Sequence, residues 1–589
     1  MTYAAPVNAF HYLLRHAVDI DSLMALPAHS EVSHDLIGDI LDGAASFTAD
    51  VLAPLNWTGD QSHPVLAGGN VTASPGFKDA YAQYAEAGWM SLSMGADIGG
   101  MGLPQSLAVA TCEMTYAANM AFGLCPMLTS SAVKAVHAHA SGALKAIYLE
   151  KMVSGEWTGA MDLTEPQSGS DLGTLTAKAV PNGDGSYAVS GQKIYITWGD
   201  HDCAENIIHL VLARLPDAPA GSRGISLFLC PKYLVNADGS LGDRNNFKPI
   251  GLEHKLGIHG SPTCTMEFDG AAGWLIGEPN KGLACMFTMM NEARLFVGVQ
   301  GVAIGERAYQ AALNYAQERV QGKIAGGEAG DPIIGHADVR RMLIDMKARL
   351  MGARAICMAT AMAGDLAHSL PDEASRKAAH AREALLTPIA KAYSTDLGVE
   401  AASIGVQVHG GMGFVEETGA AQHYRDARIA PIYEGTNGIQ AIDLVGRKLR
   451  RDGGEAMRAL IADIEAIYAL VEADNKNAGE ADSVCEPALR RALEALKTAT
   501  DIMLNAAEPD ALAAATDYLA LVGDVVSGAY LIKAAVNGQR AGDALSANMQ
   551  KLANFHAVSV MPRAAARLES IRRGAAPIFD FPLAQLADL

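Results

Sequence analysis

Apolar side chains recur at helical spacing through the first part of the chain. The pattern is clearest in Phe77–Glu86 and Ser106–Ala118, where hydrophobic residues return every three or four positions. Between these segments, the sequence Gly-Gly-Met-Gly-Leu-Pro at Gly99–Pro104 is typical of a loop. Residues 1–157 are therefore expected to form a helical N-terminal domain.

The pattern changes near Met161, where short runs rich in Val, Ile, Leu and Phe replace the helical spacing. A strand is expected over Tyr187–Thr197, because it directly follows the turn sequence Gly183-Asp184-Gly185. A small β domain is therefore expected over residues 158–280. The further strand candidates in it are Ile207–Leu215, Ile225–Leu234 and Thr263–Phe268.

Helical spacing returns at Gly282 and continues to the end of the chain. The last block, 451–589, is rich in Ala and Leu, with joints expected at Asn475–Glu480 and Glu508–Pro509. Long helices are expected before it over Ala284–Val320, Ala337–Ala367 and Ser375–Val408. The fold class is thus α+β and mostly α, with four expected domains: 1–157, 158–280, 281–450 and 451–589.

The composition fits a folded protein of several domains and argues against nucleic acid as the main partner. Of the 589 residues, 50% are hydrophobic and 19% are charged, and the formal net charge is −20. Such an acidic chain lacks the positive surface that a phosphate backbone requires. The N-terminus has neither the basic start nor the apolar run of a signal peptide, so a cytoplasmic location is expected.

The sequence indicates neither a metal site nor a membrane span. The eight cysteines are scattered without a Cys-x-x-Cys pair, which favours buried free thiols over a zinc or redox site. The longest charge-free stretch lies between Glu113 and Lys134, but it contains Asn119, Gly123 and Pro126. We therefore expect a buried helix and loop there, and no membrane insertion.

The first candidate binding segment is Met161–Asp171, with the sequence MDLTEPQSGSD. Its Thr, Ser and Gly residues beside a strand could present backbone N–H groups and hydroxyls to a phosphate or to a flavin edge. A polar turn that merely enters the β domain explains the same residues. On spacing alone the plain turn is the simpler interpretation, because Gly-rich turns are common.

Four segments, in this order, resemble the signatures of the acyl-CoA dehydrogenase family. They are MDLTEPQSGSD at 161–171, KIYITWGD at 193–200, QVHGGMGF at 407–414 and RDARIAPIYEGTNGIQ at 425–440. The resemblance covers about residues 60–450. It implies the family's fold: an N-terminal helical domain, a middle β-barrel-like domain and a C-terminal helical bundle, followed here by an extra C-terminal helical domain.

The resemblance implies FAD as the cofactor and assigns its contacts by position. Tyr195 and Thr197 would lie at the isoalloxazine ring, with Tyr195 standing where the family more often has Trp. Arg319 would reach the flavin diphosphate of a neighbouring subunit, because a planar guanidinium suits a phosphate. A homodimer or homotetramer is therefore expected. The other expected flavin contacts are Met161, Leu163, Thr164, Ser170, Gln321, Gln407, Gly410, Gly411 and Thr436.

Glu434, in Pro-Ile-Tyr-Glu-Gly-Thr, is the expected catalytic base. The α-proton of a thioester is only weakly acidic, and desolvation raises the pKa of a carboxylate, which makes it a stronger base. The apolar run Ile429–Tyr433 gives Glu434 apolar walls, and Gly435 gives a thioester room to come close. Without the resemblance, a solvated Glu at a helix start would be the simpler interpretation.

A second base position used in the family falls on Ala293 here, which removes that alternative. Glu292, one residue earlier, would point about 100° away on a helix. The resemblance implies that Arg294 supports the catalytic site electrostatically, with a surface salt bridge as the alternative. The implied substrate contacts are Ser170, Asn291, Arg294 and Gly435. Packing or loop roles are expected for His259 and His409.

About 139 residues follow position 450, where the resemblance ends, which points to a long branch of the family. One such branch is the very-long-chain type; another is bacterial and includes the 3-methylmercaptopropionyl-CoA dehydrogenases and a DNA-associated alkylation-response relative. Residues 451–589 hold 13 Lys and Arg against 19 Asp and Glu, the wrong sign for DNA or an anionic membrane. This block is expected to pack on the dehydrogenase core or at a subunit interface.

The expected substrate follows from the bacterial branch, which three parts of the chain resemble most: HKLGIHGSPTCTMEF at 254–268, GLACMFTMMNEARLFVGVQG at 282–301 and the end of the chain. It is 3-(methylsulfanyl)propanoyl-CoA, oxidised to 3-(methylsulfanyl)acryloyl-CoA in the breakdown of sulfur compounds derived from dimethylsulfoniopropionate. An electron-transfer flavoprotein is the expected acceptor. The alternatives are a medium- or long-chain acyl-CoA dehydrogenase, an oxidase that uses oxygen, and a flavin-binding DNA-associated relative without this activity.

Overall fold

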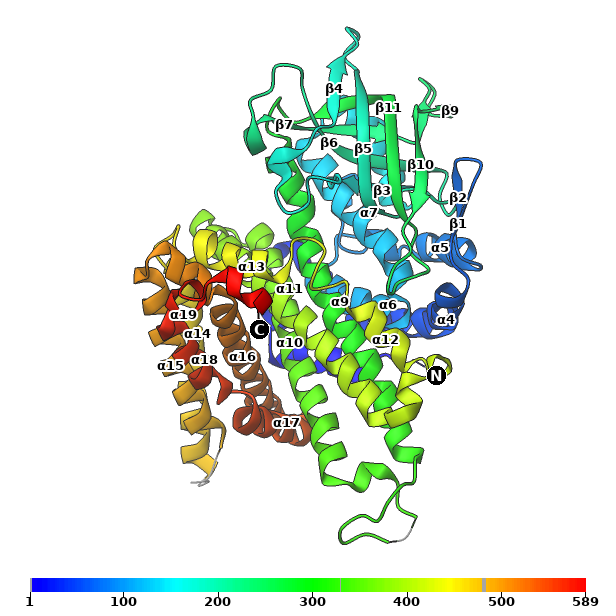
Figure 1. Cartoon of the computed structure of the whole chain (residues 1–589). Helices are drawn as coiled ribbons and strands as arrows, with labels where there is room; N and C mark the ends of the chain where they lie inside the picture. The colour runs from blue at the N-terminus through cyan, green and yellow to red at the C-terminus, as the bar shows by residue number, and fades with distance from the viewer. Residues whose placement is uncertain (1–2, 329, 479–483, 589) are drawn as a thin grey trace. The chain divides into compact units, whose positions relative to one another are not determined.

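The computed structural model describes residues 3–328, 330–478 and 484–588. The chain divides into two compact units (Figure 1). We call residues 43–296 the sheet unit, and residues 5–42 together with 297–589 the helical unit. The boundary falls within helix α9 (Gly282–Glu318), so the division into four domains stays a prediction.

The sheet unit is built on strands that close into a ring. Strands β11, β5, β4, β6 and β7 pair in that order, and β7 pairs back to β11. This closure is the β-barrel-like domain that the sequence predicted, and its interior is filled by residues such as Val189, Val211 and Phe228. The strand bounds are β3 (Trp157–Asp162), β4 (Lys178–Pro181), β5 (Tyr187–Thr197), β6 (Asn206–Arg214), β7 (Ile225–Pro231), β8 (Tyr233–Val235), β9 (Leu241–Arg244), β10 (Phe247–Leu252) and β11 (Thr263–Ile276).

Two predicted strands differ from the observed ones. The strand expected over 225–234 is split into β7 and β8 at Lys232, whose side chain is buried against Asp200. The strand expected over 263–268 continues eight residues further as part of β11. It does so because Gly270, at a φ of 72°, forms a bulge in the strand instead of ending it.

The helices of the sheet unit lie where the apolar spacing predicted them. Helices α5 (Phe77–Glu86) and α6 (Gln105–Ala118) are followed by α7 (Met120–His139), which packs against β3 (Figure 1). The charge-free stretch therefore forms buried helix, as expected. It is interrupted at Asn119, whose Oδ1 accepts a hydrogen bond from Phe122 N at 3.1 Å and caps α7. Other elements of this unit are α4 (Ala53–Gln61), β1 (Val65–Ala67), β2 (Asn70–Thr72) and α8 (Gly142–Val153).

The helical unit contains the second part of α9 and the other long helices that the sequence predicted. Helix α14 runs through the first part of the joint expected at 475–480, and the rest of that joint lies outside the described residues. Helix α16 starts at Glu508 with Pro509 in its first turn, where the missing N–H is tolerated. The bounds are α10 (Ala337–Ser369), α11 (Glu373–His409), α12 (Ala420–Ala427), α13 (Asn437–Asp443), α14 (Glu455–Ala478), α15 (Cys485–Asn505), α16 (Glu508–Ala541), α17 (Ser546–Ser559) and α18 (Arg563–Arg573).

The C-terminal block packs on the helices that precede it, as one of the two expected arrangements. Helix α16 lies against α10, α11 and α13 (Figure 1). The approach is close, since a Cβ at Gly523 would lie 2.2 Å from the ring of Tyr393. Tyr393 Oη donates to Asp524 Oδ1 at 3.2 Å, and Arg567 Nε donates to Asp524 Oδ2 at 3.0 Å. Buried polar contacts thus join the block to α11.

Helices α10 and α16 are each long and apolar enough to cross a membrane by length and composition. In both, however, 83% of the apolar window is buried inside the structure, as in the core helix of a folded domain. The eight cysteines are free, with Cys112 half-buried and the others buried, which confirms the expected thiols. Within the described ranges, no group of three or more His, Cys, Asp or Glu is placed to hold a metal ion.

Candidate active site

One buried carboxylate organises the segment that follows β3. Glu165 accepts hydrogen bonds from the backbone N–H groups of Thr176 (2.6 Å) and Ala177 (3.0 Å) and from Lys193 Nζ (2.8 Å). Burial alone would raise its pKa, but the Lys193 ammonium and these hydrogen bonds outweigh burial and lower the pKa of Glu165 to about 2. Glu165 is therefore ionised and ties the segment to the residues before β4.

Lys193 joins the same segment to strand β5. Its ammonium is fully buried and also donates to Leu163 O at 3.0 Å. Burial lowers the pKa of Lys193, and the Glu165 carboxylate opposes that shift. One residue on, Ile194 N donates to Thr164 O at 2.9 Å. The structure thus brings Leu163 and Thr164 beside β5, which carries Tyr195 and Thr197.

Tyr195 projects from a bulge in β5. The pairing register between β5 and β11 shifts at this point, and Tyr195 takes a φ of 61°. A positive φ is uncommon outside glycine and marks strain that clusters at functional sites. The bulge leaves Tyr195 60% exposed, with Thr197 half-buried two residues on. An exposed aromatic face on a strained strand fits the stacking position of a flavin ring.

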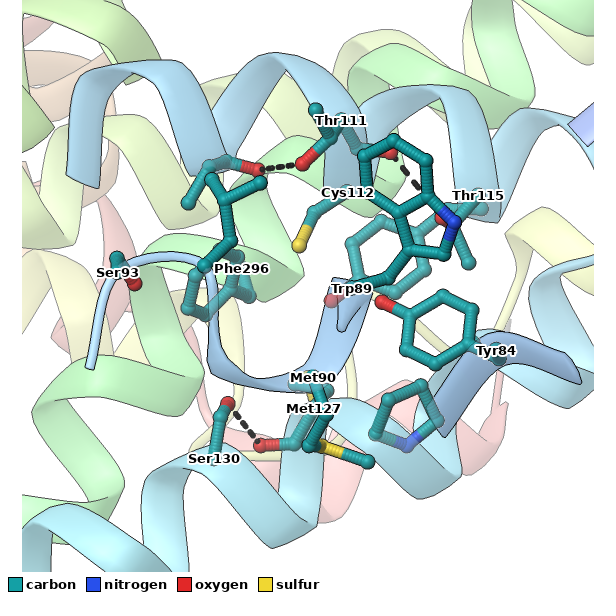
Figure 2. Close-up of a pocket in the computed structure, with 15 residues that line it drawn as sticks. Tyr84, Trp89, Met90, Ser93, Thr111, Cys112, Thr115, Met127, Ser130 and Phe296 are labelled. Atoms are coloured by element: carbon teal, nitrogen blue, oxygen red, sulfur yellow. Dashed lines mark hydrogen bonds between the residues drawn. The ribbon is translucent and has the colours of Figure 1, made fainter. Parts of the chain in front are cut away.

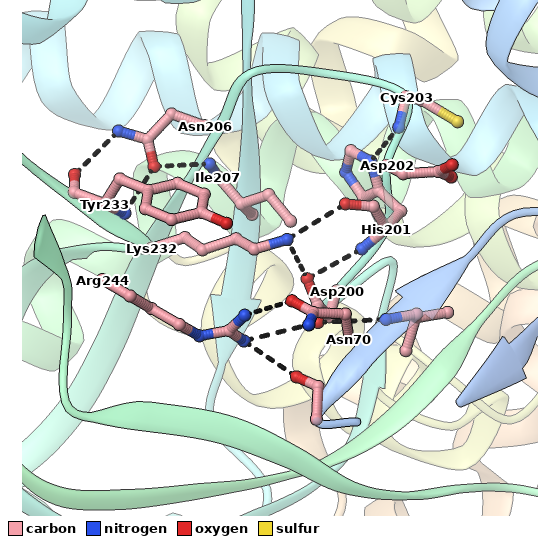
Figure 3. A network of polar contacts seen from close by, with 12 residues as sticks. Asn70, Asp200, His201, Asp202, Cys203, Asn206, Ile207, Lys232, Tyr233 and Arg244 are labelled. Atoms are coloured by element: carbon pink, nitrogen blue, oxygen red, sulfur yellow. Dashed lines mark hydrogen bonds and ion pairs between the residues drawn. The ribbon is translucent and has the colours of Figure 1, made fainter. Parts of the chain in front are cut away.

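The chain after Thr197 is clamped to the hairpin of β1 and β2. Asp200 is buried and accepts a hydrogen bond from Lys232 Nζ (Figure 3). It also accepts one from Val71 N at 3.3 Å. Arg244 Nη2 lies 3.7 Å from the same carboxylate and donates to Gly69 O at 3.0 Å. This network neutralises the buried charge of Asp200 and fixes the end of the strand that presents Tyr195.

Ser170 lies at the exposed tip of the turn in the signature segment. Beneath it, Glu165 and Ser168 exchange two backbone hydrogen bonds of 3.0 and 2.9 Å, and Ser168 Oγ donates to Asp171 O at 2.8 Å. Asp171 Oδ1 in turn accepts from Gly173 N at 2.8 Å. The turn is therefore rigid beneath an accessible Ser170 hydroxyl.

Arg294 and Asn291 lie one helical turn apart on α9. Arg294 is 4% exposed, donates from Nη1 to Asn291 Oδ1 at 3.4 Å, and has its guanidinium carbon 5.7 Å from the ring centroid of Phe287. A surface salt bridge therefore does not describe Arg294, because the side chain is buried. Asn291 is exposed beside it.

Glu292 is engaged elsewhere, and Ala293 is fully buried. The Glu292 carboxylate accepts from Lys134 Nζ at 2.7 Å and from Gln105 Nε2 at 2.8 Å. The Glu292 carboxylate is thus bound by two donors, one of them cationic, at the position next to the family's second base position, which Ala293 fills.

A narrow cavity of about 30 Å³ lies between α6, α7 and the start of α9 (Figure 2). Space of this size holds about two water molecules. The rings of Trp89 and Tyr84 lie at one end and Phe296 at the other (Figure 2). The walls are formed by Met90, Thr111, Cys112, Thr115, Met127 and Ser130, among others.

The lining of this cavity is mostly apolar, although it contains hydroxyl groups and the indole N–H of Trp89. Thr111 Oγ1 donates to Ala108 O (3.0 Å), and Ser130 Oγ donates to Met127 O (3.0 Å), so each hydroxyl is satisfied by its own helix. Burial, together with the nearby Glu292 carboxylate, raises the pKa of Cys112 to about 12. Cys112 is therefore a neutral thiol, and the cavity presents sulfur atoms and rings.

In the helical unit, Glu434 and Gly435 form a turn before α13. Their φ angles are 55° and 84°, so both residues are in the left-handed region. Glu434 is half-buried and does not cap the helix. The cap is Thr436, whose Oγ1 accepts from Ile439 N at 3.3 Å. The interpretation of Glu434 as a solvated glutamate at a helix start does not explain its strained backbone, because Thr436 caps the helix.

The residue before this turn is anchored on α9. Tyr433 Oη donates to Gln300 Oε1, and Gln300 is fully buried. Burial and then the Glu434 carboxylate raise the pKa of Tyr433 far above its ordinary value, so it stays a neutral donor. Asn437 N also donates to Pro431 O at 3.0 Å, which closes the loop on itself.

Arg319 and Gln321 follow the end of α9. Both are exposed, and Arg319 Nη2 donates to Gln321 Oε1 at 3.4 Å. The backbone around them is held by a bridge between Val320 and Pro332. An exposed guanidinium on a fixed backbone fits an anionic group such as a diphosphate.

Gln407, Gly410 and Gly411 lie at the neighbouring end of α11 and are exposed. The two helix ends meet where the His409 ring lies 4.5 Å from that of Tyr315. Side chains added at either glycine would meet no atom within 4 Å, so the turn is open. Such an open turn beside Arg319 and Gln321 fits the polar end of a dinucleotide.

His409 and His259 are each held by contacts within the fold. His409 Nδ1 lies 2.7 Å from Gly405 O, and burial lowers the pKa of His409. His259 Nδ1 lies 2.9 Å from Asp60 Oδ1, and its Nε2 lies 2.8 Å from Lys255 O. Both are held within the fold, as packing and loop roles require.

The pattern along the chain did not single out Lys193, Lys391 or the cavity. The sequence feature that could have indicated these two residues is a lysine beside apolar neighbours. Lys193 precedes the apolar Ile194, and Lys391 lies within Ile389-Ala390-Lys391-Ala392. A lysine on a buried face needs a partner, and here the partners lie in the two signature segments.

Family models match most of the chain. The acyl-CoA dehydrogenase N-terminal, middle and C-terminal domains match residues 40–156, 160–271 and 280–449. A model described as acetyl-CoA dehydrogenase C-terminal like matches residues 460–582. The extra helical block therefore also has a counterpart among known proteins.

One known relative matches nearly the full chain, and another matches about half of it. The 3-methylmercaptopropionyl-CoA dehydrogenase of Ruegeria pomeroyi is 47% identical over 533 residues, which cover 90% of each protein. A caffeyl-CoA reductase–Etf complex subunit of Acetobacterium woodii is 29% identical over 307 residues, 52% of this chain and 72% of that protein. The structure of Caenorhabditis elegans ACDH-11 in complex with C11-CoA matches with a TM-score of 0.77 at 21% identity, covering 95% of this chain and 92% of that one.

Proposed function

Because the chain belongs to the acyl-CoA dehydrogenase family, an FAD-dependent family of oxidoreductases, we propose that it converts 3-(methylsulfanyl)propanoyl-CoA to 3-(methylsulfanyl)acryloyl-CoA. The observation that carries the choice of substrate is 47% identity, over 90% of both chains, to the Ruegeria pomeroyi enzyme of that name. We propose a cytoplasmic location for it.

The cavity between α6, α7 and α9 supports a short acyl group. With about 30 Å³ it has room for a small terminal group and not for a long chain. Its lining brings Met90, Met127 and Cys112 together with aromatic rings, a soft and polarisable surface that suits a thioether. We assign this cavity to the methylsulfanyl end of the substrate.

Glu434 is the base in this proposal. Forming the double bond removes a proton from the α-carbon and a hydride from the β-carbon; FAD, when bound, accepts the hydride. The Glu434 carboxylate takes the α-proton, and its half-buried position limits competition from water. The buried Arg294 guanidinium supports negative charge that develops on the thioester, and Asn291, Ser170 and Gly435 contact the CoA thioester.

On the flavin side, the sheet unit supplies the ring contacts. Tyr195 and Thr197 would stack along the isoalloxazine, and the fixed segment beside them would supply hydrogen bonds and apolar contact. Thr436 adds a contact from the helical unit. The remaining assigned residues are Met161, Leu163, Thr164 and Ser170.

The spacing along α9 supports a flavin site shared between subunits. Tyr433, the neighbour of Glu434, is anchored at Gln300 on α9. Arg319 follows Gln300 by nineteen residues, which corresponds to about 28 Å along the helix. The distance from Gln300 to Arg319 therefore exceeds the reach from a flavin ring to its own diphosphate. We therefore propose a homodimer or homotetramer in which Arg319, Gln321, Gln407, Gly410 and Gly411 serve the flavin of a partner chain.

The acceptor we propose is an electron-transfer flavoprotein. The relative from Acetobacterium woodii is a subunit of an Etf complex, which supports this choice over oxygen. Reduction of oxygen by the purified enzyme would give hydrogen peroxide, and it is expected at no more than a few per cent of turnover. Peroxide formed at the rate of substrate loss would identify an oxidase instead.

A matched substrate panel tests the proposal. The purified holoenzyme is assayed with an artificial acceptor against 3-(methylsulfanyl)propanoyl-CoA, pentanoyl-CoA, in which a methylene replaces the sulfur, and octanoyl-CoA. The highest kcat/KM is expected for the thioether and the lowest for octanoyl-CoA. A preference for octanoyl-CoA would contradict the short cavity, and tight DNA binding at physiological salt without turnover would favour the DNA-associated alternative.

A further inference from the structure

Lys391 places a buried ammonium against the turn that carries Glu434. It lies on α11 among the buried residues Ile389, Ala390 and Ala392, and it is itself fully buried. Its Nζ donates to Gly435 O at 2.9 Å and to Asn437 Oδ1 at 2.8 Å. A lysine is kept inside a protein only where such acceptors compensate for lost hydration.

The turn needs such support, because its backbone is strained. A left-handed φ of 55° costs about 1–3 kcal/mol at a non-glycine residue and persists only where surrounding contacts enforce it. Here the carbonyls of both turn residues are held from α13, since Gln440 Nε2 lies 3.3 Å from Glu434 O and 3.2 Å from Gly435 O. Lys391 supplies the charged donor to the second of these carbonyls.

Asn437 joins the same contacts from the start of α13. Its Nδ2 donates to Thr395 Oγ1 at 3.0 Å and to Asp396 Oδ1 at 2.7 Å. The loop is thus fastened to one face of α11 over residues 391–396, directly beside the half-buried Glu434. Loss of the ammonium would remove the shorter and charged of the two hydrogen bonds to Gly435 O, leave the one from Gln440 Nε2, and let the turn relax toward ordinary φ values.

We propose that Lys391 is a positioning residue that holds the Glu434–Gly435 turn and so keeps the Glu434 carboxylate in one orientation. The inference rests on the proposed role of Glu434 as base. Lys391 acts through the backbone of Gly435 and takes no proton from the substrate.

Rapid-reaction kinetics of the FAD-loaded enzyme with ordinary and α-deuterated 3-(methylsulfanyl)propanoyl-CoA test the role of Lys391. In Lys391→Met, kcat is expected to fall about 10- to 100-fold, because small misplacements of a catalytic group cost that much. KM is expected to stay within about threefold, because binding contacts are retained. The α-deuterium isotope effect is expected to rise, because proton removal becomes more rate-limiting.

Two further variants keep the test decisive. Lys391→Gln keeps a donor without burying a charge, and it replaces Lys391→Met in the test if that variant does not fold. Its kcat is expected to fall about tenfold. Lys347→Met removes another largely buried ammonium, which pairs with Glu306 in the same unit, and is expected to keep wild-type kcat. A Lys391 variant with wild-type kcat and isotope effect, or an equal loss in Lys347→Met, would overturn the proposal.

Failure of this inference is distinguishable from failure of the proposed function. If Glu434→Gln is inactive while both Lys391 variants are unchanged, the base assignment stands and the positioning role is wrong. If Glu434→Gln turns over like the wild type, the base assignment itself is wrong.

Discussion

Replacing Lys193 with Met tests how the signature segment is held beside β5. The change removes the ammonium that lies 2.8 Å from Glu165 Oε1 and 3.0 Å from Leu163 O and leaves a carboxylate that is 2% exposed. Breaking a buried ion pair from one side costs about 3–5 kcal/mol. The pKa of Glu165 gives a second measure: a fall from 4.5 to about 2 corresponds to about 3 kcal/mol. Because backbone N–H groups of Thr176 and Ala177 still bind Glu165, we expect a loss of about 3 kcal/mol.

The assay is urea unfolding of the FAD-saturated protein, followed by circular dichroism, for Lys193→Met, Glu165→Gln and the double variant. The double variant is expected to be more stable than the sum of the two losses implies, because neither charge is left alone. FAD affinity is expected to fall with Lys193→Met, because Leu163 and Thr164 lose their anchor to β5. Losses that simply add, or an unchanged FAD affinity, would refute the reasoning.

The pH dependence adds an independent check. In the wild type the pKa of Glu165 is lowered by folding, so its contribution is present above pH 4.5 and is lost as the pH falls toward about 2. In Lys193→Met burial dominates and raises this pKa above its ordinary value, so acid relieves the buried charge. The stability difference between wild type and variant should therefore shrink from pH 7 to pH 4. A difference that stays constant over this range would exclude an ionised Glu165.

Three further expectations concern the cofactor and the acyl pocket. Arg319→Ala should weaken FAD binding about 10- to 100-fold, because a charge-assisted contact of about 1.5–3 kcal/mol is lost. Flavin fluorescence on dilution measures this affinity, and an unchanged affinity would contradict the diphosphate role. Met127→Ala should open the cavity and raise kcat/KM for octanoyl-CoA relative to pentanoyl-CoA, by about fourfold for each methylene admitted, and an unaltered ratio would place the acyl chain elsewhere. Trp89 Nε1 is buried without a hydrogen-bond partner among the residues the structure describes, so its N–H is available to the sulfur of the substrate. Trp89→Phe should therefore reduce the preference for the thioether over pentanoyl-CoA by about threefold. Equal preference in wild type and Trp89→Phe would show that the sulfur is not recognised there.

The elements with regular patterns were predictable from the sequence. Helix α5 and strand β5 have the predicted bounds, because apolar residues at a period of 3.6 or 2 decide which face is buried. The errors occurred where tertiary contacts override the local pattern. Lys232 interrupts a run of strand-forming residues to reach Asp200, which lies 32 positions earlier in the chain.

For the candidate site, the sequence predicted the residues that the family resemblance assigns, but not the residues that support them. The family resemblance named Glu434, Tyr195 and Arg319, but the strained backbone at Glu434 and Tyr195 leaves no mark in the sequence. The supporting cations Lys193 and Lys391 were missed for a physical reason. Each becomes meaningful only when folding brings a distant carboxylate or carbonyl within hydrogen-bond distance.

The most direct measurement is one anaerobic turnover of the purified FAD-loaded enzyme with 3-(methylsulfanyl)propanoyl-CoA, run in parallel with Glu434→Gln. The account predicts that the wild type bleaches the flavin absorbance and forms an acyl-CoA lighter by two hydrogens. Glu434→Gln should bind FAD and substrate normally and leave the flavin oxidised, with bleaching slowed by at least about 10³-fold. No bleaching by the wild type, or bleaching at the same rate in the variant, would contradict the account.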